Sequence, residues 1–176
     1  MNVKFLNPFV DAAAEVLMAE AKVTINKGTL TLQKSAMTTD EVTVLINLVG
    51  QVQGVVLFGL SQALGMKLVS KMMDQEFTVF DNLAQSGVAE LGNVISGRAT
   101  VLLSDAGYQS TISPPTMITG KGVQISTLDF PRIVVPLACE FGEMVIHLAL
   151  RESQAGEWND NFVPLIKEAT SSKLQN

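Results

Sequence analysis

The chain has 176 residues, 47% of them apolar and 16% charged, which fits one globular domain and excludes a disordered chain. A net charge of -5 without a Lys/Arg cluster argues against a nucleic-acid partner. A lone cysteine excludes an internal disulfide. Because no segment reaches the ~20 consecutive apolar residues of a membrane span, we expect a cytoplasmic protein with no membrane partner.

The first predicted helix starts at Pro8, which follows Asn7, and runs to about Ala21. Its apolar spacing predicts a buried stripe made of Phe9, Ala13, Val16 and Leu17, with Met18 as a further candidate.

Strand patterns follow this helix. Residues 24–32 read as extended chain with a glycine turn, and 42–49 and 54–60 form a predicted hairpin around 50–53. Ser61 can then cap a helix from Gln62 to Met73.

A long central helix is predicted from Asn82 to Ser104, capped by Asp81 or Asn82. At 3.6 residues per turn one face is apolar and must be buried; it comprises Ala84, Val88, Leu91, Ile95, Ala99 and Leu102. Ser86, Glu90 and Asn93 share the opposite face within an arc of roughly 60°. Gly97 falls on that arc as well.

Three glycines in this helix, Gly87, Gly92 and Gly97, together cost about 3 kcal/mol of helix stability relative to alanine. Two interpretations stay open. The glycines admit a neighbouring helix or strand, which spacing alone favours, or they leave bare backbone that another molecule can approach closely.

Beyond the helix, Gly107 offers a stop and Pro114–Pro115 predicts a stiff loop. Strands are expected over 123–128, 132–141 and 144–150, the last two joined by a turn at Gly142–Glu143. His147 in the final strand has no visible partner, so we expect it to be structural. From Arg151 onward the chain turns polar.

Familiar catalytic motifs are missing from the sequence. One His and one Cys cannot build a zinc shell, and no EF-hand, Walker or Rossmann fingerprint is present. The nearest approach to a nucleophile elbow, residues 59–63, lacks its final glycine. The polar helix face is therefore the candidate site.

The spacing Ser86-x3-Glu90-x2-Asn93, followed 22 positions later by Pro115, resembles the signature of the CheC/CheX/FliY family of CheY-P phosphatases. The run from Glu90 to Ala99 also resembles that family's central helix. A partial copy, Asp11-x3-Glu15-x2-Met18, occurs on the first helix, with methionine in place of asparagine. Because CheX-like members carry the motif on the second helix only, this half-copy favours CheX.

The resemblance implies an α+β, CheC-like fold: an antiparallel sheet of about six strands packed against long helices, with an internal pseudo-two-fold repeat. Residues 1–150 would form a single CheX-like domain, and 151–176 a polar C-terminal extension of unknown role.

The resemblance also implies a chemotaxis phosphatase acting on a phosphorylated CheY-like response regulator. Asn93 would position the attacking water and Glu90 would pair with a lysine of the partner, while Ser86, Gly97 and Pro115 would serve docking. No cofactor is expected on this chain, and Mg2+ is expected on the partner. With one site per chain and free sheet edges, we expect a homodimer.

Two other readings stay open on the sequence. A non-catalytic adaptor would bind a response regulator or flagellar switch component through the same helix face, and a purely structural domain would have no phosphate chemistry.

Overall fold

The computed structural model describes residues 3–34, 37–125 and 131–154. The elements in chain order are a 3-10 turn (Val3–Phe5), α1 (Leu6–Ala21), β1 (Asn26–Lys27), β2 (Thr31–Gln33), β3 (Met37–Thr38), β4 (Val42–Gly50), β5 (Val52–Leu60), α2 (Gln62–Met73), α3 (Asn82–Asp105), β6 (Ser110–Ile112), β7 (Thr116–Thr119), β8 (Gln124–Ile125), β9 (Arg132–Cys139) and β10 (Gly142–Glu152).

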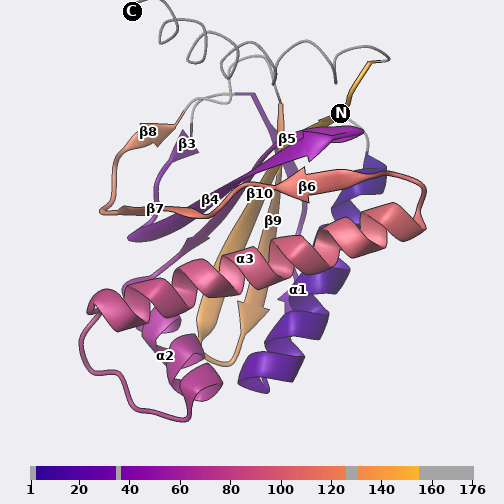
Figure 1. Cartoon of the computed structure of the whole chain (residues 1–176). Coiled ribbons are helices and arrows are strands. Elements are labelled where there is room, and N and C mark those ends of the chain that lie inside the picture. Colours follow the sequence, from indigo (N-terminus) through magenta and orange to yellow (C-terminus); the bar gives the residue numbers. More distant parts are fainter. Residues whose placement is uncertain (1–2, 35–36, 126–130, 155–176) are drawn as a thin grey trace, which may run out of the picture.

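The helices lie on one face of an antiparallel sheet (Figure 1). The strand order is β1-β9-β10-β5-β4-β6, with β2 also paired to β9 and β7 also paired to β4. β3 and β8 pair separately with each other. This arrangement confirms the predicted α+β class with about six strand positions across the sheet.

The strand order is symmetric about the central β5–β10 pair. In the first half, α1 is followed by the short strands β1 and β2 and then by the β4–β5 hairpin. In the second half, α3 is followed by β6 and β7 and later by the β9–β10 hairpin. Each set of short strands pairs with the hairpin of the other half. The two halves therefore interlock, in keeping with the predicted pseudo-two-fold repeat.

Local sequence signals placed the central hairpin and α2 correctly. β4 pairs with β5 from Val42 opposite Leu60 to Leu48 opposite Gly54. The Ser61 side chain caps α2 as predicted, because its Oγ accepts a hydrogen bond of 3.1 Å from the Leu64 backbone N–H. The predicted turn at Gly142–Glu143 was wrong: Gly142 pairs with Cys139, so Glu140 and Phe141 form the turn.

The first helix differs from its prediction at both its start and its buried face. α1 begins at Leu6, two residues early, and Phe5 precedes it without a side-chain cap. Pro8 lies in the first turn, where a missing N–H leaves no hydrogen bond unmade. Met18 is 46% exposed, because it stands about 100° further round the helix than buried Leu17.

The two strands β6 and β7 were not expected. Both run along β4, β6 beside its last residues and β7 beside its first. Pro114 and Pro115 fall between them, where the missing backbone donors interrupt the ladder. The predicted stiff loop is thus a short break in an edge strand.

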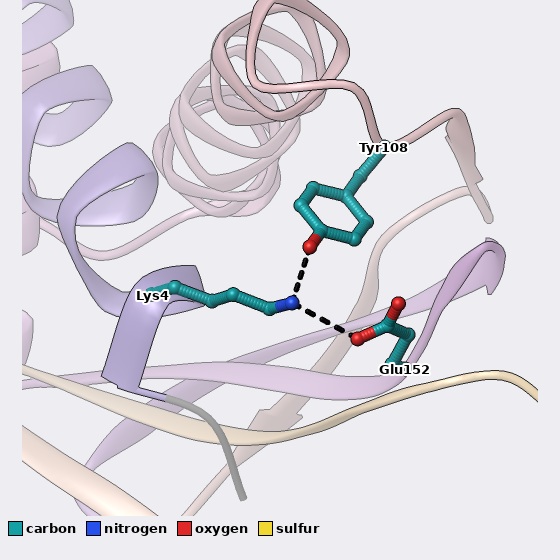
Figure 2. A network of polar contacts seen from close by, with 3 residues as sticks. All are labelled: Lys4, Tyr108 and Glu152. Atoms are coloured by element: carbon teal, nitrogen blue, oxygen red, sulfur yellow. Dashed lines mark hydrogen bonds and ion pairs between the residues drawn. The ribbon is translucent and has the colours of Figure 1, made fainter.

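A cluster of polar contacts ties both ends of the described fold together (Figure 2). Lys4 Nζ donates hydrogen bonds to the hydroxyl of Tyr108, just after α3, and at 2.9 Å to a carboxylate oxygen of Glu152 at the end of β10. The Phe5 ring packs edge-on against Tyr108, with centroids 5.3 Å apart. This cluster fixes the end of α3 relative to the sheet.

His147 is 8% exposed on β10, opposite Leu57 and Val134 of the flanking strands. Burial and the nearby Arg132 lower its pKa from 6.5 to about 4. It is therefore neutral at physiological pH, in keeping with the structural role expected for it.

The predicted C-terminal extension lies, apart from its first four residues, outside the described residues. β10 continues two residues beyond the strand end expected at Leu150. Across the described ranges, no helix has the length and apolar character needed to span a bilayer.

Candidate functional site

The candidate site is built on α3, whose start and buried face follow the sequence prediction. Asp81 caps the helix, its Oδ1 accepting a hydrogen bond of 2.9 Å from the Ala84 backbone N–H. The buried stripe contains five of the six expected side chains; Leu102 is half-buried, and Leu103 is buried instead. Packing of this stripe on the sheet sets the direction of the opposite face.

The polar face points away from the core as predicted. Ser86 and Glu90 are exposed and Asn93 is half-buried. Asn93 Nδ2 donates a hydrogen bond to Glu90 Oε2 at 3.4 Å, which is long for such a bond. The carboxamide and the carboxylate are thus neighbours at the surface, held together by a weak contact that an arriving group can replace.

Glu90 is available to an external cation. Within the described ranges, no Lys or Arg nitrogen forms an ion pair with its carboxylate, although three other acidic side chains are paired. An exposed carboxylate without an ion-pair partner can meet a lysine or arginine of another protein without first breaking an internal ion pair.

The glycines of α3 divide between the two interpretations left open by the sequence. A Cβ on Gly87 would lie 2.7 Å from Val69 Cγ1 of α2, and one on Gly92 would lie 3.0 Å from Val44 Cγ1 of β4. These two glycines admit neighbouring elements. A Cβ on Gly97 would meet only Ile112 Cδ1 at 4.0 Å, so packing does not require glycine there.

Pro115 lies in the break between β6 and β7, and both strands pack beside α3 (Figure 1). Ser113 secures this break: its backbone N–H donates to Asn47 O at 2.9 Å, and its Oγ accepts from Asn47 N at 3.0 Å. Ile112 of β6 is the neighbour nearest Gly97. The structure therefore gathers Ser86, Glu90, Asn93 and Gly97 on one face and places Pro115 in the strand segment bordering that helix.

The partial copy of the motif on α1 is used differently. Glu15, which corresponds to Glu90, accepts a hydrogen bond of 2.5 Å from Arg98 Nε on α3. This contact with Arg98 lowers the pKa of the Glu15 carboxyl. With Met18 at the asparagine position and Glu15 paired to Arg98, α1 lacks a counterpart of the exposed Glu90–Asn93 pair. Sequence reasoning missed this ion pair, although Arg98 is the sole basic residue of α3.

A cleft of about 470 Å³ lies elsewhere, at the C-terminal end of α2. Its lining includes Lys67, Ser70, Lys71 and Phe141 and none of the polar-face residues. Because Ser86 and Glu90 are exposed on the outward face of α3, that face is suited to contact with a macromolecule rather than to enclosing a small ligand.

The chemistry available on this face is limited to positioning. A neutral carboxamide can donate to one group while accepting a hydrogen bond from a water molecule, and a carboxylate can pair with a cation. Neither group is a strong nucleophile. Such a face can complete a reaction centre whose reactive groups belong to another molecule.

Comparison with known proteins identifies the family of this chain. The family model described as "Chemotaxis phosphatase CheX" matches residues 42–138, more than half of the chain. CheY-P phosphatase CheX of Thermotoga maritima is 32% identical over 84 residues, which are 47% of this chain and 54% of that protein. The chain thus spans about half the length of this relative.

Solved structures match over a larger share of the chain. A CheC-like superfamily protein from Shewanella sp. PV-4 has a TM-score of 0.78 at 30% identity. The match covers 86% of this chain and 99% of the Shewanella chain. CheX from Borrelia burgdorferi, solved as a complex with CheY, BeF3 and Mg2+, has a TM-score of 0.71 at 26% identity. The match covers 86% of this chain and 100% of the Borrelia chain. Together with the family match and the fold, these likenesses establish that the chain belongs to the CheX family.

Proposed function

We propose that this chain is a phosphatase that hydrolyses the aspartyl phosphate of a phosphorylated CheY-like response regulator. The observation that carries the proposal is the exposed Glu90–Asn93 pair on the outward face of α3, in a chain of the CheX family. The similar Thermotoga maritima protein is a CheY-P phosphatase, and the similar Borrelia burgdorferi protein forms a complex with CheY.

In the proposed reaction, water attacks phosphorus while the bond from phosphorus to the aspartyl oxygen breaks. The products are the free aspartate and inorganic phosphate, and both protons of the water end on the phosphate. The partner supplies the activated leaving group and binds Mg2+, which neutralises charge there. This chain binds no cofactor in the proposal.

Asn93 is the proposed catalytic residue. Its side-chain oxygen accepts a hydrogen bond from the attacking water and so holds that water in line with the phosphorus. A carboxamide suits this role because it stays neutral, so it adds no negative charge beside the phosphoryl group. Such positioning can lower a barrier by several kcal/mol.

Glu90 is the proposed docking carboxylate. In the complex it pairs with a lysine near the partner's active site, which fixes the approach of the two proteins. The 3.4 Å contact from Asn93 to Glu90 is then replaced by the lysine, leaving the amide available to the water and phosphoryl group. Ser86, one turn earlier, contributes to docking, as do Gly97 and Pro115.

The test is multiple turnover with limiting protein. One equivalent of this chain is mixed with a large excess of phosphorylated receiver domain, and phosphate release is followed in real time. A phosphatase releases many equivalents of phosphate per chain. Release of no more than one equivalent identifies the non-catalytic adaptor instead, and rates equal to spontaneous hydrolysis with no binding leave a structural domain.

We further propose a cytoplasmic homodimer formed partly by strand pairing. The sheet has two outer edges, β1 with β2 beyond β9 and β6 with β7 beyond β4. The Pro114–Pro115 break makes the second edge less able to pair, because proline donates no ladder hydrogen bond. Light scattering at micromolar concentration tests this: a dimer mass is expected, and a monomer mass contradicts it.

A further inference from the structure

Besides its core stripe, α3 carries a second line of residues along one flank of its polar face, buried at Gly87 and exposed at both ends. These positions alternate in steps of four and three residues, a spacing that keeps them in one row along the helix. The row consists of Leu83, Gly87, Glu90, Val94, Gly97 and Val101. Leu83 and Val101, at its two ends, are each 48% exposed. The row therefore begins and ends with apolar side chains in solvent, on either side of Glu90.

α2 adds another exposed apolar side chain to this row. Met73 is 40% exposed, and its Cε would lie 3.3 Å from a Cβ placed on Gly87. Gly87 stands between Leu83 and Glu90 in the row, so Met73 covers the helix backbone at that point. Met73 therefore lies beside the part of α3 that carries Leu83 on one side of Gly87 and Glu90 on the other.

Glu90 is the charged member of this row on α3. Arg98, the sole basic residue of α3, is held by Glu15 of α1 at 2.5 Å. A complementary partner therefore presents apolar side chains together with a cation that meets Glu90.

The proposed reaction determines what occupies this surface. If Asn93 reaches a phosphoryl group on another protein, that protein must cover the surroundings of Asn93. A standard interface buries about 800 Å² on each partner, equivalent to a disc of about 16 Å radius. At 1.5 Å per residue, Leu83 lies about 15 Å and Val101 about 12 Å from Asn93 along the helix axis. Both exposed ends of the row fall within the footprint.

We propose that Leu83, Met73 and Val101 are the specificity-determining contacts through which this chain selects its receiver domain. The selected receiver carries apolar side chains around the lysine that meets Glu90, and a receiver with polar groups at those points binds weakly. This inference rests on the proposed function, because the reaction is what places the receiver over α3.

The test compares Leu83→Ser, Met73→Gln and Val101→Ser with a matched control, Val123→Ser. Val123 is 46% exposed, a fraction similar to that of Val101, but it directly precedes β8 and lies outside α3. The receiver used is the one that the wild-type chain binds most tightly in its activated form, and its phosphorylated form is the substrate. Binding is measured on the same receiver activated with beryllofluoride and Mg2+, in which beryllofluoride stands in for the phosphoryl group.

We expect each of the three substitutions to raise KM about tenfold and to weaken binding of the activated receiver equally, with kcat unchanged. The control should stay within about twofold of wild type in both measurements. Thermal unfolding verifies that the exposed substitutions leave the fold intact, and any one folded variant suffices for the comparison.

Unchanged KM and affinity in the folded variants would overturn the inference, as would a fall in kcat at constant KM. These outcomes are separable from failure of the proposed function. If the wild-type chain shows no turnover yet the three substitutions weaken receiver binding, the docking contacts stand and the phosphatase proposal fails. If turnover depends on Asn93 but the three substitutions leave KM unchanged, the phosphatase proposal stands and the docking contacts fail.

Discussion

The carboxylate of Glu15 on α1 accepts a 2.5 Å hydrogen bond from Nε of Arg98 on α3. Glu15 corresponds to Glu90 in the second half of the pseudo-two-fold fold, so the two equivalent acids have different partners. One joins the two long helices, and the other faces solvent without an ion-pair partner among the described residues. The backbone repeat is therefore present in both halves, whereas the exposed Glu–Asn pair is present only on α3.

Breaking this pair should have a small, salt-dependent effect on stability. The side chains of Arg98 and Glu15 are 40% and 50% exposed, so solvent and salt screen the pair and it contributes little. We expect Arg98→Gln to lower the melting temperature slightly at low salt and not at 1 M NaCl. Phosphate release should be unchanged; a large loss of release would assign Arg98 to the site.

Restoring asparagine on α1 should not create a second site. In the background of Asn93→Ala, Met18→Asn supplies an amide, but Glu15 remains bound to Arg98. We expect phosphate release to stay at the level of Asn93→Ala alone. Recovery of turnover in the double variant would show that the Glu15 pair does not block the first-half motif.

The glycines of α3 predict a contrast between two identical substitutions. Gly87→Ala places a Cβ 2.7 Å from Val69, so we expect a loss of about 1 to 3 kcal/mol in the free energy of unfolding. Gly97→Ala meets only Ile112 at 4.0 Å, so the helix should be unaffected or stabilised by up to about 1 kcal/mol.

At Gly97 we expect the alanine substitution to impair activity although it does not reduce stability. If the receiver approaches the bare backbone there, Gly97→Ala raises KM while leaving the protein at least as stable. Urea unfolding and phosphate release on the same samples check both statements. A Gly97→Ala variant with wild-type KM would remove Gly97 from the docking surface.

Burial of His147 predicts loss of stability in mild acid. Its pKa is about 4 when folded, against 6.5 for an ordinary histidine. The unfolded chain therefore binds the extra proton first, and the stability present above pH 6.5 is lost as pH falls towards 4. From pH 7 to pH 5 we expect this histidine to account for a loss of about 2 kcal/mol.

His147→Leu supplies the comparison, because leucine does not titrate. Its unfolding free energy should fall less than that of the wild-type chain between pH 7 and pH 5, as measured by urea unfolding. Parallel pH profiles for the two proteins would show that His147 has the same pKa in the folded and the unfolded chain, which would contradict the prediction.

Removing the docking carboxylate should affect binding and turnover together. We expect Glu90→Ala to weaken the complex with the beryllofluoride-activated receiver and to slow phosphate release, since the lysine of the partner loses its counter-charge. Titration calorimetry and release kinetics measure the two effects. Raising the salt concentration should reduce the difference between variant and wild type if the pairing is electrostatic.

The features predicted correctly from the sequence are those fixed by neighbouring residues. The Ser61 cap of α2, the Asp81 cap of α3 and the outward direction of Glu90 all depend on spacing within one or two helical turns. Hydrophobic periodicity and helix capping depend on residues close together in the chain, so they can be predicted from one sequence.

The features missed depend on contacts between distant parts of the chain. β6 and β7 are short and interrupted by prolines, and they are strands because β4 lies beside them. The Arg98 pair with Glu15 joins residues 83 positions apart. Likewise, only the packing of α2 and β4 against α3 reveals why Gly87 and Gly92 are glycines while Gly97 need not be.

The most direct test of the central claim is the rate of phosphate release by Asn93→Ala with its cognate phosphorylated receiver. Asn93 is half-buried at the surface and contacts Glu90, so alanine should leave the fold and receiver affinity intact. We expect kcat to fall by about 100-fold or more, with affinity for the beryllofluoride-activated receiver within about twofold of wild type. An unchanged kcat in the folded variant would contradict water positioning by Asn93.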